Sequence, residues 1–192
     1  NTLATDSGPS HAIVANLRLG VNGPDADNGT LQNGAATADD TSNTGSADDE
    51  DGVTVLPGVT TISASVPMTV SVFNNTGASA TVACWIDFNR DGDFVDTGER
   101  AATTVSASAS QQTASLTFTG FAAPTAGTSY LRCRLATAAG EVTNPTGAAN
   151  TGEVEDYQVT IAQASPPTYS ISKVLNGVSP VRNGETISFT IR

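Results

Sequence analysis

Residues 81–99 read TVACWIDFNRDGDFVDTGE and join two patterns that decide the fold. In the first half, alternate side chains are apolar and share one face of an extended chain: Val82, Cys84, Ile86 and Phe88. This period of two predicts a strand with one buried face. The second half is rich in Asp, Asn and Gly, which predicts a loop directly after the strand.

Short alternating segments recur on both sides of this stretch. They are residues 59–66, 68–73, 114–118, 129–135 and 157–161, with an opening strand expected within 11–19. Gly, Pro or Asn separates most of them, and no amphipathic helix is evident. The sequence therefore predicts an all-β fold, an antiparallel immunoglobulin-like or jelly-roll β-sandwich with a long acidic N-terminal loop region.

The two cysteines lie on predicted strands with their side chains on the apolar faces. Cys84 shares its face with Val82 and Ile86, and Cys133 shares its face with Leu131 and Leu135. Two inward cysteines on separate strands of a secreted protein predict a disulfide, worth about 4 kcal/mol in the chain-entropy model. Two unpaired buried thiols are the alternative.

Composition narrows the class of protein. The chain of 192 residues has a net charge of −11, which argues against nucleic-acid binding because a polyanion would be repelled. No stretch approaches 18 apolar residues, so we expect no membrane insertion. The chain opens at Asn1, so we expect that any secretion signal has been removed and that the protein is secreted, extracellular and associated with the cell surface.

Changes in composition divide the chain into four parts. These are residues 1–52, an N-terminal strand plus an acidic Asp/Asn/Gly-rich segment that packs on the main domain; 53–162, the β-sandwich; 163–167, a Pro-rich linker; and 168–192, two further strands. By composition alone the polar tract 21–52 would be a disordered linker. Two strands cannot form a stable domain by themselves, so 168–192 either joins the sandwich, begins another domain or pairs with a neighbouring molecule.

The loop at residues 87–99 is the strongest candidate for a metal site. Asp87, Asn89, Asp91 and Asp93 stand at alternate positions around Gly92, as in a calcium-binding loop. The twelfth position is Gly98 rather than Glu, and the flanks are predicted strands, so this is not an EF-hand. A bidentate carboxylate would come from Asp96, Glu99 or elsewhere.

Two further acidic clusters are weaker candidates. Glu153, Glu155 and Asp156 lead into the strand at 157–161, and a charged strand start is the alternative interpretation. Asp49 and Asp51 belong to the run at 48–51, for which a charged linker is the default. With Asp25, Asp27, Asp39 and Asp40 upstream of the run at 48–51, the three clusters hold 16 of the 19 acidic residues, and such an arrangement favours a hard cation such as calcium.

These segments together resemble the bacterial GEVED domain. The resemblance spans roughly residues 1–162 and rests on PDAD at 24–27, DDEDGV at 48–53, WIDFNRDGDF at 85–94 and GEVEDY at 152–157. It implies a secreted β-sandwich module of large bacterial surface proteins, with calcium at 87–99 and a contribution from Glu153, Glu155 or Asp156 to an acidic site.

The tail at 168–192 is similar to the first two strands of an immunoglobulin-like repeat that occurs in tandem on bacterial surface proteins. Lys173, the only lysine, falls on the apolar face of this segment. A buried lysine needs a partner, and an isopeptide bond to a later Asn or Asp is one hypothesis. A lysine that snorkels at the strand end is the alternative.

The sequence thus favours a calcium-stabilised structural or adhesive module of a secreted bacterial cell-surface protein, without catalytic activity. Two alternatives remain open: a subunit of an extracellular fibre assembled by strand donation, and a calcium-dependent carbohydrate-binding module. The expected partners are neighbouring domains or copies of the same protein, or a glycan or other cell-surface ligand. For the carbohydrate alternative, the aromatic candidates beside the loop are Phe88, Phe94, Phe121 and Tyr130.

Overall fold

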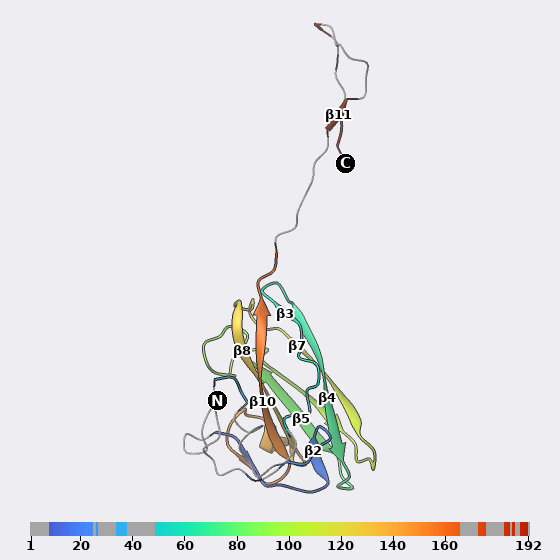
Figure 1. Cartoon of the computed structure of the whole chain (residues 1–192), viewed down its shortest axis with the longest axis vertical. Helices are drawn as coiled ribbons and strands as arrows, with labels where there is room; N and C mark the ends of the chain where they lie inside the picture. The colour runs from blue at the N-terminus through green and yellow to red at the C-terminus, as the bar shows by residue number, and fades with distance from the viewer. Residues whose placement is uncertain are drawn as a thin grey trace.

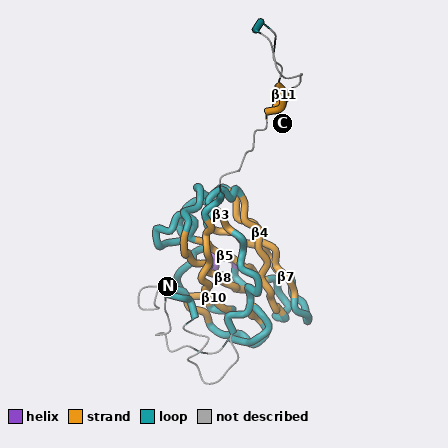
Figure 2. The backbone as a smooth tube through the Cα atoms, turned by 45° about the horizontal axis from the view of Figure 1, so that its top comes forward, coloured by secondary structure: helices purple, strands orange, loops and turns teal. Residues whose placement is uncertain are grey.

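The structure is a computed structural model, which we describe for residues 8–24, 26, 34–37, 49–165, 173–175, 183–184, 186 and 189–191. It is all-β, as predicted, with mixed and antiparallel sheets. Figure 1 shows the strands of residues 10–162 gathered into one elongated body, and Figure 2 shows that loops connect nearly all of them. No helix in the described part of the chain is long and apolar enough to span a membrane.

The larger sheet has five strands in the order β3-β10-β8-β5-β6. Their bounds are β3 Val59–Thr60, β5 Ala80–Ile86, β6 Arg100–Val105, β8 Gly127–Ala136 and β10 Glu153–Ala162. All neighbours are antiparallel except β3, which runs parallel to the end of β10. The central strands β8 and β5 are buried on both faces over most of their length.

The smaller sheet has three antiparallel strands in the order β2-β4-β7. Their bounds are β2 Leu17–Leu19, β4 Ser65–Asn74 and β7 Gln112–Thr119. Both β4 and β7 alternate between buried and exposed side chains, as expected for a sheet with one face on the core and one face in solvent. The alternation of apolar and polar residues in the sequence therefore corresponds to the buried and exposed faces of this sheet.

Four short strands and one helical turn complete the described chain. β1 Ser10–His11 pairs parallel with β9 Ala148–Ala149, and the 3-10 helix η2 spans Ala139–Val142. β11 Lys173–Leu175 and β12 Phe189–Ile191 form an antiparallel pair with each other and with no other described strand. The fold is therefore not purely antiparallel, because β1–β9 and β3–β10 are parallel pairs.

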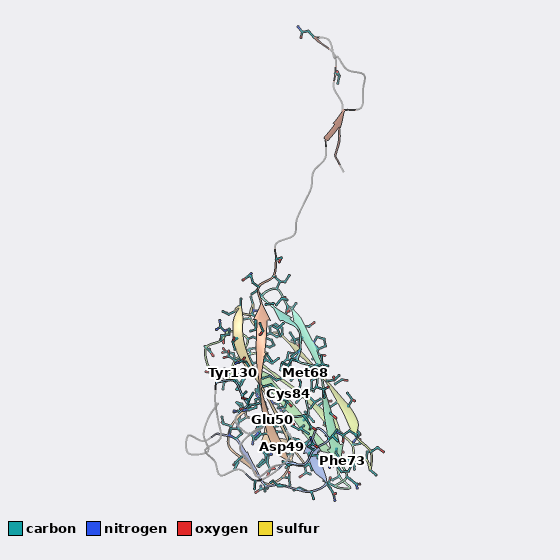
Figure 3. The ribbon with its side chains drawn as sticks, in the orientation of Figure 1. Asp49, Glu50, Met68, Phe73, Cys84 and Tyr130 are labelled. Atoms are coloured by element: carbon teal, nitrogen blue, oxygen red, sulfur yellow. A yellow bond between two sulfur atoms is a disulfide. The ribbon has the colours of Figure 1, made fainter. Side chains whose placement is uncertain are left out.

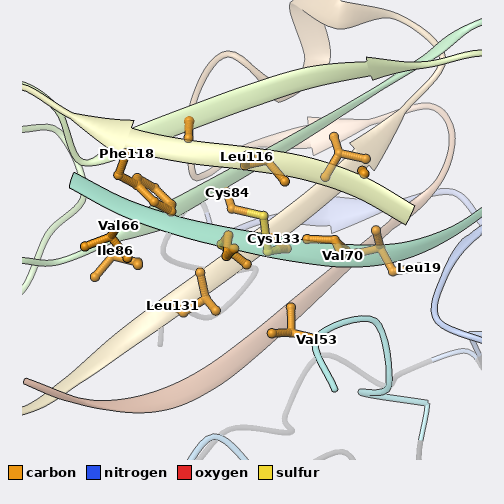
Figure 4. Packing of buried hydrophobic residues seen from close by; sticks show 14 of the residues in the cluster. Leu19, Val53, Val66, Val70, Cys84, Ile86, Leu116, Phe118, Leu131 and Cys133 are labelled. Carbon is orange, nitrogen blue, oxygen red and sulfur yellow. A yellow bond between two sulfur atoms is a disulfide. The ribbon is translucent and has the colours of Figure 1, made fainter. Parts of the chain in front are cut away.

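One hydrophobic core joins the two sheets (Figure 4). The smaller sheet contributes Leu17, Leu19, Val66, Met68, Val70, Val72, Ala114, Leu116 and Phe118. The larger sheet contributes Val82, Cys84, Ile86, Leu131, Cys133, Leu135, Val159 and Ile161. Burial of this apolar surface is the main favourable term that holds the sheets together.

The disulfide lies inside this core, where β5 and β8 run side by side. Cys84 and Cys133 are directly opposite each other in the ladder and are bonded, and both are fully buried. Since the two strands are neighbours in one sheet, the bond crosslinks strands within that sheet and does not join the two sheets. The prediction of a disulfide is confirmed, and the alternative of two free thiols is wrong.

Several strand boundaries differ from the predicted ones. The segment 59–66 is interrupted by a turn in which Ser63 N–H donates to the Thr60 carbonyl, so β4 begins only at Ser65. β4 then runs through Pro67. β2 pairs only with residues 72–74 of β4, so no strand lies beside Pro67 on that edge and its missing N–H costs no ladder hydrogen bond there. The strand β6 was not predicted, because its sequence RAATTV has only small and β-branched residues after Arg100, with weak alternation.

The N-terminal region also differs from the expectation. The single strand expected within 11–19 is two short strands, β1 and β2, with a turn at residues 15–16 between them. Of the polar tract 21–52, the described residues 49–52 pack on β10 and on the residues after β2. The acidic residues Asp25, Asp27, Asp39, Asp40 and Asp48 lie outside the described residues.

Candidate functional site

The acidic loop at residues 87–99 connects β5 to β6, so both of its ends are held by the same ladder. Trp85 pairs with Arg100, and Ile86 N–H donates to the Glu99 carbonyl. The flanks are therefore strands, as predicted, and not the helices of an EF-hand. The loop is therefore the connection of a β-hairpin, and the pairing of β5 with β6 fixes the positions of both its ends.

Two buried carboxylates organise the backbone of this loop from inside. Asp87 accepts hydrogen bonds from Arg90 N–H at 2.5 Å and from Gly92 N–H at 3.1 Å. Glu99 accepts one from Phe88 N–H at 2.8 Å. Both side chains are almost fully buried, so they define the loop's shape and do not face solvent.

Three exposed carboxylates gather on the outer side of the loop. Asp91, Asp93 and Asp96 each present an oxygen, and these oxygens all lie within 4.8 Å of one another. The Asn89 side-chain amide nitrogen donates to Asp91 at 2.9 Å and to Asp96 at 2.6 Å. Of the four residues whose alternate spacing pointed to calcium, Asp91 and Asp93 belong to this group, Asn89 contacts it through its amide nitrogen, and Asp87 faces inward.

The one basic side chain of the loop turns away from these carboxylates. Arg90 has φ 64°, and its guanidinium and Nε donate to the carbonyls of Ala126 and Thr128. Gly92, at φ 96°, supplies the sharp turn that the sequence predicted. The negative charge of the loop is therefore not balanced by Arg90.

Burial among like charges perturbs the two inner carboxyls. Burial, followed by the charges of Asp87 and Asp96, raises the pKa of Glu99 to about 7. Burial also raises the pKa of Asp87, with Asp91 adding to the effect. A cation close to these groups would favour their charged forms and reverse the direction. The outer donor set, made of carboxylate oxygens, suits a hard cation such as calcium.

A different acidic site lies on β10, at the residues of the GEVED sequence at 152–156. Glu153 and Glu155 point inward on β10, on the same side as Val159 and Ile161, and both are buried. Glu153 accepts a hydrogen bond from Leu19 N–H at 2.7 Å, and Glu155 accepts one from Gly52 N–H at 2.9 Å. These glutamates therefore anchor the two ends of the acidic tract to the sheet.

Residues 49–53 complete this anchor from the other side. Asp51 accepts from Val21 N–H at 2.9 Å and from Asn22 N–H at 3.1 Å, and Glu50 accepts from Asp156 N–H at 2.9 Å. Asp49 is buried, and Figure 3 shows it next to Glu50 in the part of the molecule where β10 and β2 lie. Hydrogen bonds to carboxylates thus join residues 21–22 to Asp51 and Glu50 to β10.

Burial dominates the electrostatics of this anchor. It raises the pKa of Glu153 to about 9, with the charge of Glu155 adding to the effect. Burial likewise raises the pKa of Glu155 to about 8. The Tyr157 hydroxyl donates to Glu155 at 2.8 Å and accepts from Val53 N–H at 2.9 Å. Tyr157 therefore links the Glu155 carboxyl to Val53, the residue after Gly52.

Asp156 lies on the opposite face of β10 and has a different partner. It forms a two-point ion pair with Arg132 of β8, at 2.7 and 2.6 Å. Of the predicted ligands, the structure groups Asp91, Asp93 and Asp96 and places Asp87, Asn89 and Glu99 in the same loop. It sets Glu153, Glu155, Asp49 and Asp51 apart at the anchor, and Asp156 on the opposite face of β10. Calcium binding at the anchor stays a prediction.

Sequence reasoning missed a buried arginine on the outer face of the larger sheet. Arg134 is fully buried and donates to the carbonyls of Asn144, Thr146 and Gly147 at 2.7 to 2.8 Å. Its Nε donates to His11 Nε2 at 2.9 Å, so His11 carries its proton on Nδ1 and donates to the Thr151 carbonyl. Burial lowers the pKa of His11 to about 4, so the ring is neutral near pH 7.

The sequence signal for this feature was a pair of arginines, Arg132 and Arg134, which alternate with the apolar residues Leu131, Cys133 and Leu135 of β8. Together with Trp85, Ala83, Ala136 and Val142, they show that the outer face of the larger sheet is also covered. For Lys173 the structure describes only the backbone, in β11, so the isopeptide hypothesis falls outside the described side chains.

Comparison with known protein families gives a match to the central part of the chain. The family model of the GEVED domain matches residues 81–160, which run from the start of β5 to near the end of β10. No curated protein matches the chain. The match contains both the acidic loop and the GEVED strand, and it identifies residues 81–160 as similar to the GEVED domain.

Proposed function

We propose that the chain is a calcium-stabilised structural or adhesive module of a secreted, cell-surface-associated bacterial protein. The observation that carries the proposal is the convergence of Asp91, Asp93 and Asp96, with carboxylate oxygens within 4.8 Å of one another, on a hairpin loop held at both ends. Three like charges so close together repel one another in the absence of a cation. The geometry therefore favours a cation site in which calcium is the fitting ion.

The protein's own residues would prepare this site. Asp87 and Glu99 hold the loop backbone through three hydrogen bonds from Arg90, Gly92 and Phe88. Asn89 already contacts two of the three carboxylates and could offer its carbonyl oxygen to the ion. Calcium supplies positive charge, which offsets the repulsion and would make the loop rigid.

Other features support the setting of this module. A buried disulfide is typical of a protein that folds in an oxidising compartment. We infer that the two sheets around one core form an immunoglobulin-like or jelly-roll sandwich, and that neighbouring domains or copies of the same protein are its partners. The proposal assigns no catalytic activity to the module.

Thermal unfolding of the metal-stripped protein tests the calcium proposal. We expect calcium, but not an equal concentration of magnesium, to raise the melting temperature. A ligand at 100 times its dissociation constant adds about 2.7 kcal/mol to the free energy of unfolding. The variant Asp91→Asn/Asp93→Asn/Asp96→Asn keeps the shape of the loop but should lose the response to calcium.

Thr97→Ala is the matched control, because Thr97 is an exposed loop residue outside the carboxylate group. It should respond to calcium as the wild type does. An unchanged melting temperature of the wild type in calcium, together with no heat of binding in a calorimetric titration, would refute the proposal. A response that persists in the triple variant would place the ion elsewhere, for example at the anchor of Glu153 and Glu155.

A further inference from the structure

A cavity of about 410 Å³ lies beside the acidic loop. It is lined on the loop side by Phe88, Asn89, Asp96, Thr97 and Glu99, and on the other side by the turn of Gly120, Phe121 and Ala122 that follows β7. Its volume falls within the range of small-molecule sites in proteins. The loop and the turn are in direct contact, because a Cβ on Gly98 would lie 2.3 Å from the Phe121 nitrogen.

An aromatic ring forms the apolar wall of this cavity. The Phe121 ring stacks on Phe88 with the ring centroids 3.9 Å apart, and Phe88 in turn meets the edge of Phe118 in the core. Phe88 and Phe118 are buried, whereas Phe121 is half-buried. The core therefore fixes the orientation of the one aromatic side chain that is both partly exposed and in the cavity wall.

The other wall is polar and carries negative charge. Asn89 offers an amide, Asp96 a carboxylate and Thr97 a hydroxyl group, and all three belong to the loop. No Arg or Lys lines the cavity among the described residues. These groups disfavour an anionic ligand and are suited to hydrogen bonding with neutral hydroxyl groups.

From these walls we infer that the cavity binds a neutral ligand rich in hydroxyl groups, the size of a single sugar residue. The C–H face of the sugar would pack on Phe121, and its hydroxyl groups would bond to Asn89, Asp96 and Thr97. The inference rests on the proposed calcium site, because calcium in the adjoining carboxylates orders this wall and repels a competing organic cation.

Ligand-observed saturation-transfer NMR tests the inference with the methyl glycosides of glucose, galactose, mannose and N-acetylglucosamine. In excess calcium, the wild type should transfer saturation to the ring protons of at least one of them. Ala122→Leu would place a larger side chain in the cavity while every loop carboxylate is retained, and it should weaken binding about tenfold or more, about 1.4 kcal/mol. Phe121→Leu should weaken binding in the same direction.

Ala123→Leu is the matched control, because Ala123 is exposed and does not line the cavity. It should bind the glycoside like the wild type. Calorimetric titration of calcium into the same samples separates the two proposals. Calcium binding without transfer to any glycoside overturns the sugar site alone, whereas absence of calcium binding overturns the proposed function. Equal transfer in EDTA, or equal binding by Ala122→Leu, would also contradict the inference.

Discussion

Glu153 and Glu155 show how the position of a residue changes the meaning of its charge. In the sequence they belong to an acidic run that looks solvated, yet in the structure both are buried beside the core. Each is kept there by a hydrogen bond from a backbone N–H of a distant segment, at Leu19 and Gly52. Without a cation, a buried carboxyl of this kind favours its protonated form.

This raised pKa predicts a pH dependence of stability. The folded pKa of Glu153 is about 9 and the unfolded value is 4.5, so the folded state binds the proton more tightly. In EDTA, its contribution should be largest below pH 4.5 and be lost as pH rises to about 9, by up to about 1.4 kcal/mol per pH unit. Urea unfolding at several pH values measures the slope.

Glu153→Gln removes the titrating group but keeps an oxygen for Leu19 N–H. Its free energy of unfolding should depend less steeply on pH between 5 and 9 than that of the wild type, by about one proton. Thr160→Ala, at an exposed residue of the same strand without a titrating group, serves as the control and should keep the wild-type slope. A Glu153→Gln slope equal to the wild type would show that Glu153 does not carry the effect.

At the scale of elements, a single acidic segment closes the fold against β10. Residues 49–53 contribute carboxylates that accept N–H groups, and they donate N–H groups to Glu155 and Tyr157. The contact at Gly52 is so close that a Cβ there would lie 2.4 Å from Glu155 Oε2 and 2.8 Å from Leu19 Cβ. The absence of a side chain at Gly52 is therefore a condition for docking.

Gly52→Ala should destabilise the protein through this steric conflict. We expect a loss of about 1 to 3 kcal/mol in the free energy of unfolding, as for overpacked interiors. Faster hydrogen exchange of the Leu19 and Gly52 amides should accompany it, because these donate to the two glutamates. Gly58→Ala is the matched control, since nothing lies within 4 Å of its Cβ position. Equal stability of the two variants would contradict the close contact.

At the scale of the whole molecule, a few long-range links connect segments that are far apart in the sequence, and the described residues contain no long helix. The disulfide joins residues 49 positions apart and closes a large loop of the unfolded chain. The β1–β9 and β3–β10 pairs bring together segments that are roughly a hundred residues or more apart in sequence. Such contacts cost loop-closure entropy, so crosslinks affect the stability of the entire domain.

Removal of the disulfide should therefore lower global stability. The double variant Cys84→Ala/Cys133→Ala should lose about 4 kcal/mol in urea unfolding, from the chain-entropy relation for a separation of 49 residues. The loss should appear as a lower midpoint for the cooperative unfolding of both sheets, since the bond lies in their shared core. A change below about 1 kcal/mol would show that the crosslink restricts the unfolded chain very little.

Much of the architecture was predictable because it depends on local pattern. The alternation in 81–88, 114–118 and 129–135 placed β5, β7 and β8, and the inward positions of Cys84 and Cys133 predicted the bond between them. The spacing of Asp and Gly after β5 predicted a loop with clustered carboxylates, which the structure shows at Asp91, Asp93 and Asp96. These features need only a period of two and a turn signal.

Other features depended on which distant segments meet. β6 was missed because its side chains are small and its strand character comes from pairing with β5. The anchoring role of Glu153 and Glu155, the ion pair of Arg132 with Asp156, and the carbonyl cage around Arg134 each need a partner far along the chain. A sequence states a side chain's charge, but its neighbours decide whether that charge is solvated, paired or protonated.

Taken alone, the sequence determined an all-β chain, its main strands, a disulfide and a carboxylate-rich loop, because local periodicity and residue type suffice for these. The tertiary structure alone decided that the acidic clusters separate into an exposed loop and a buried anchor, and that a cavity adjoins the loop at Phe121. The reason is physical: burial and proximity are set by long-range packing, which the order of residues does not display.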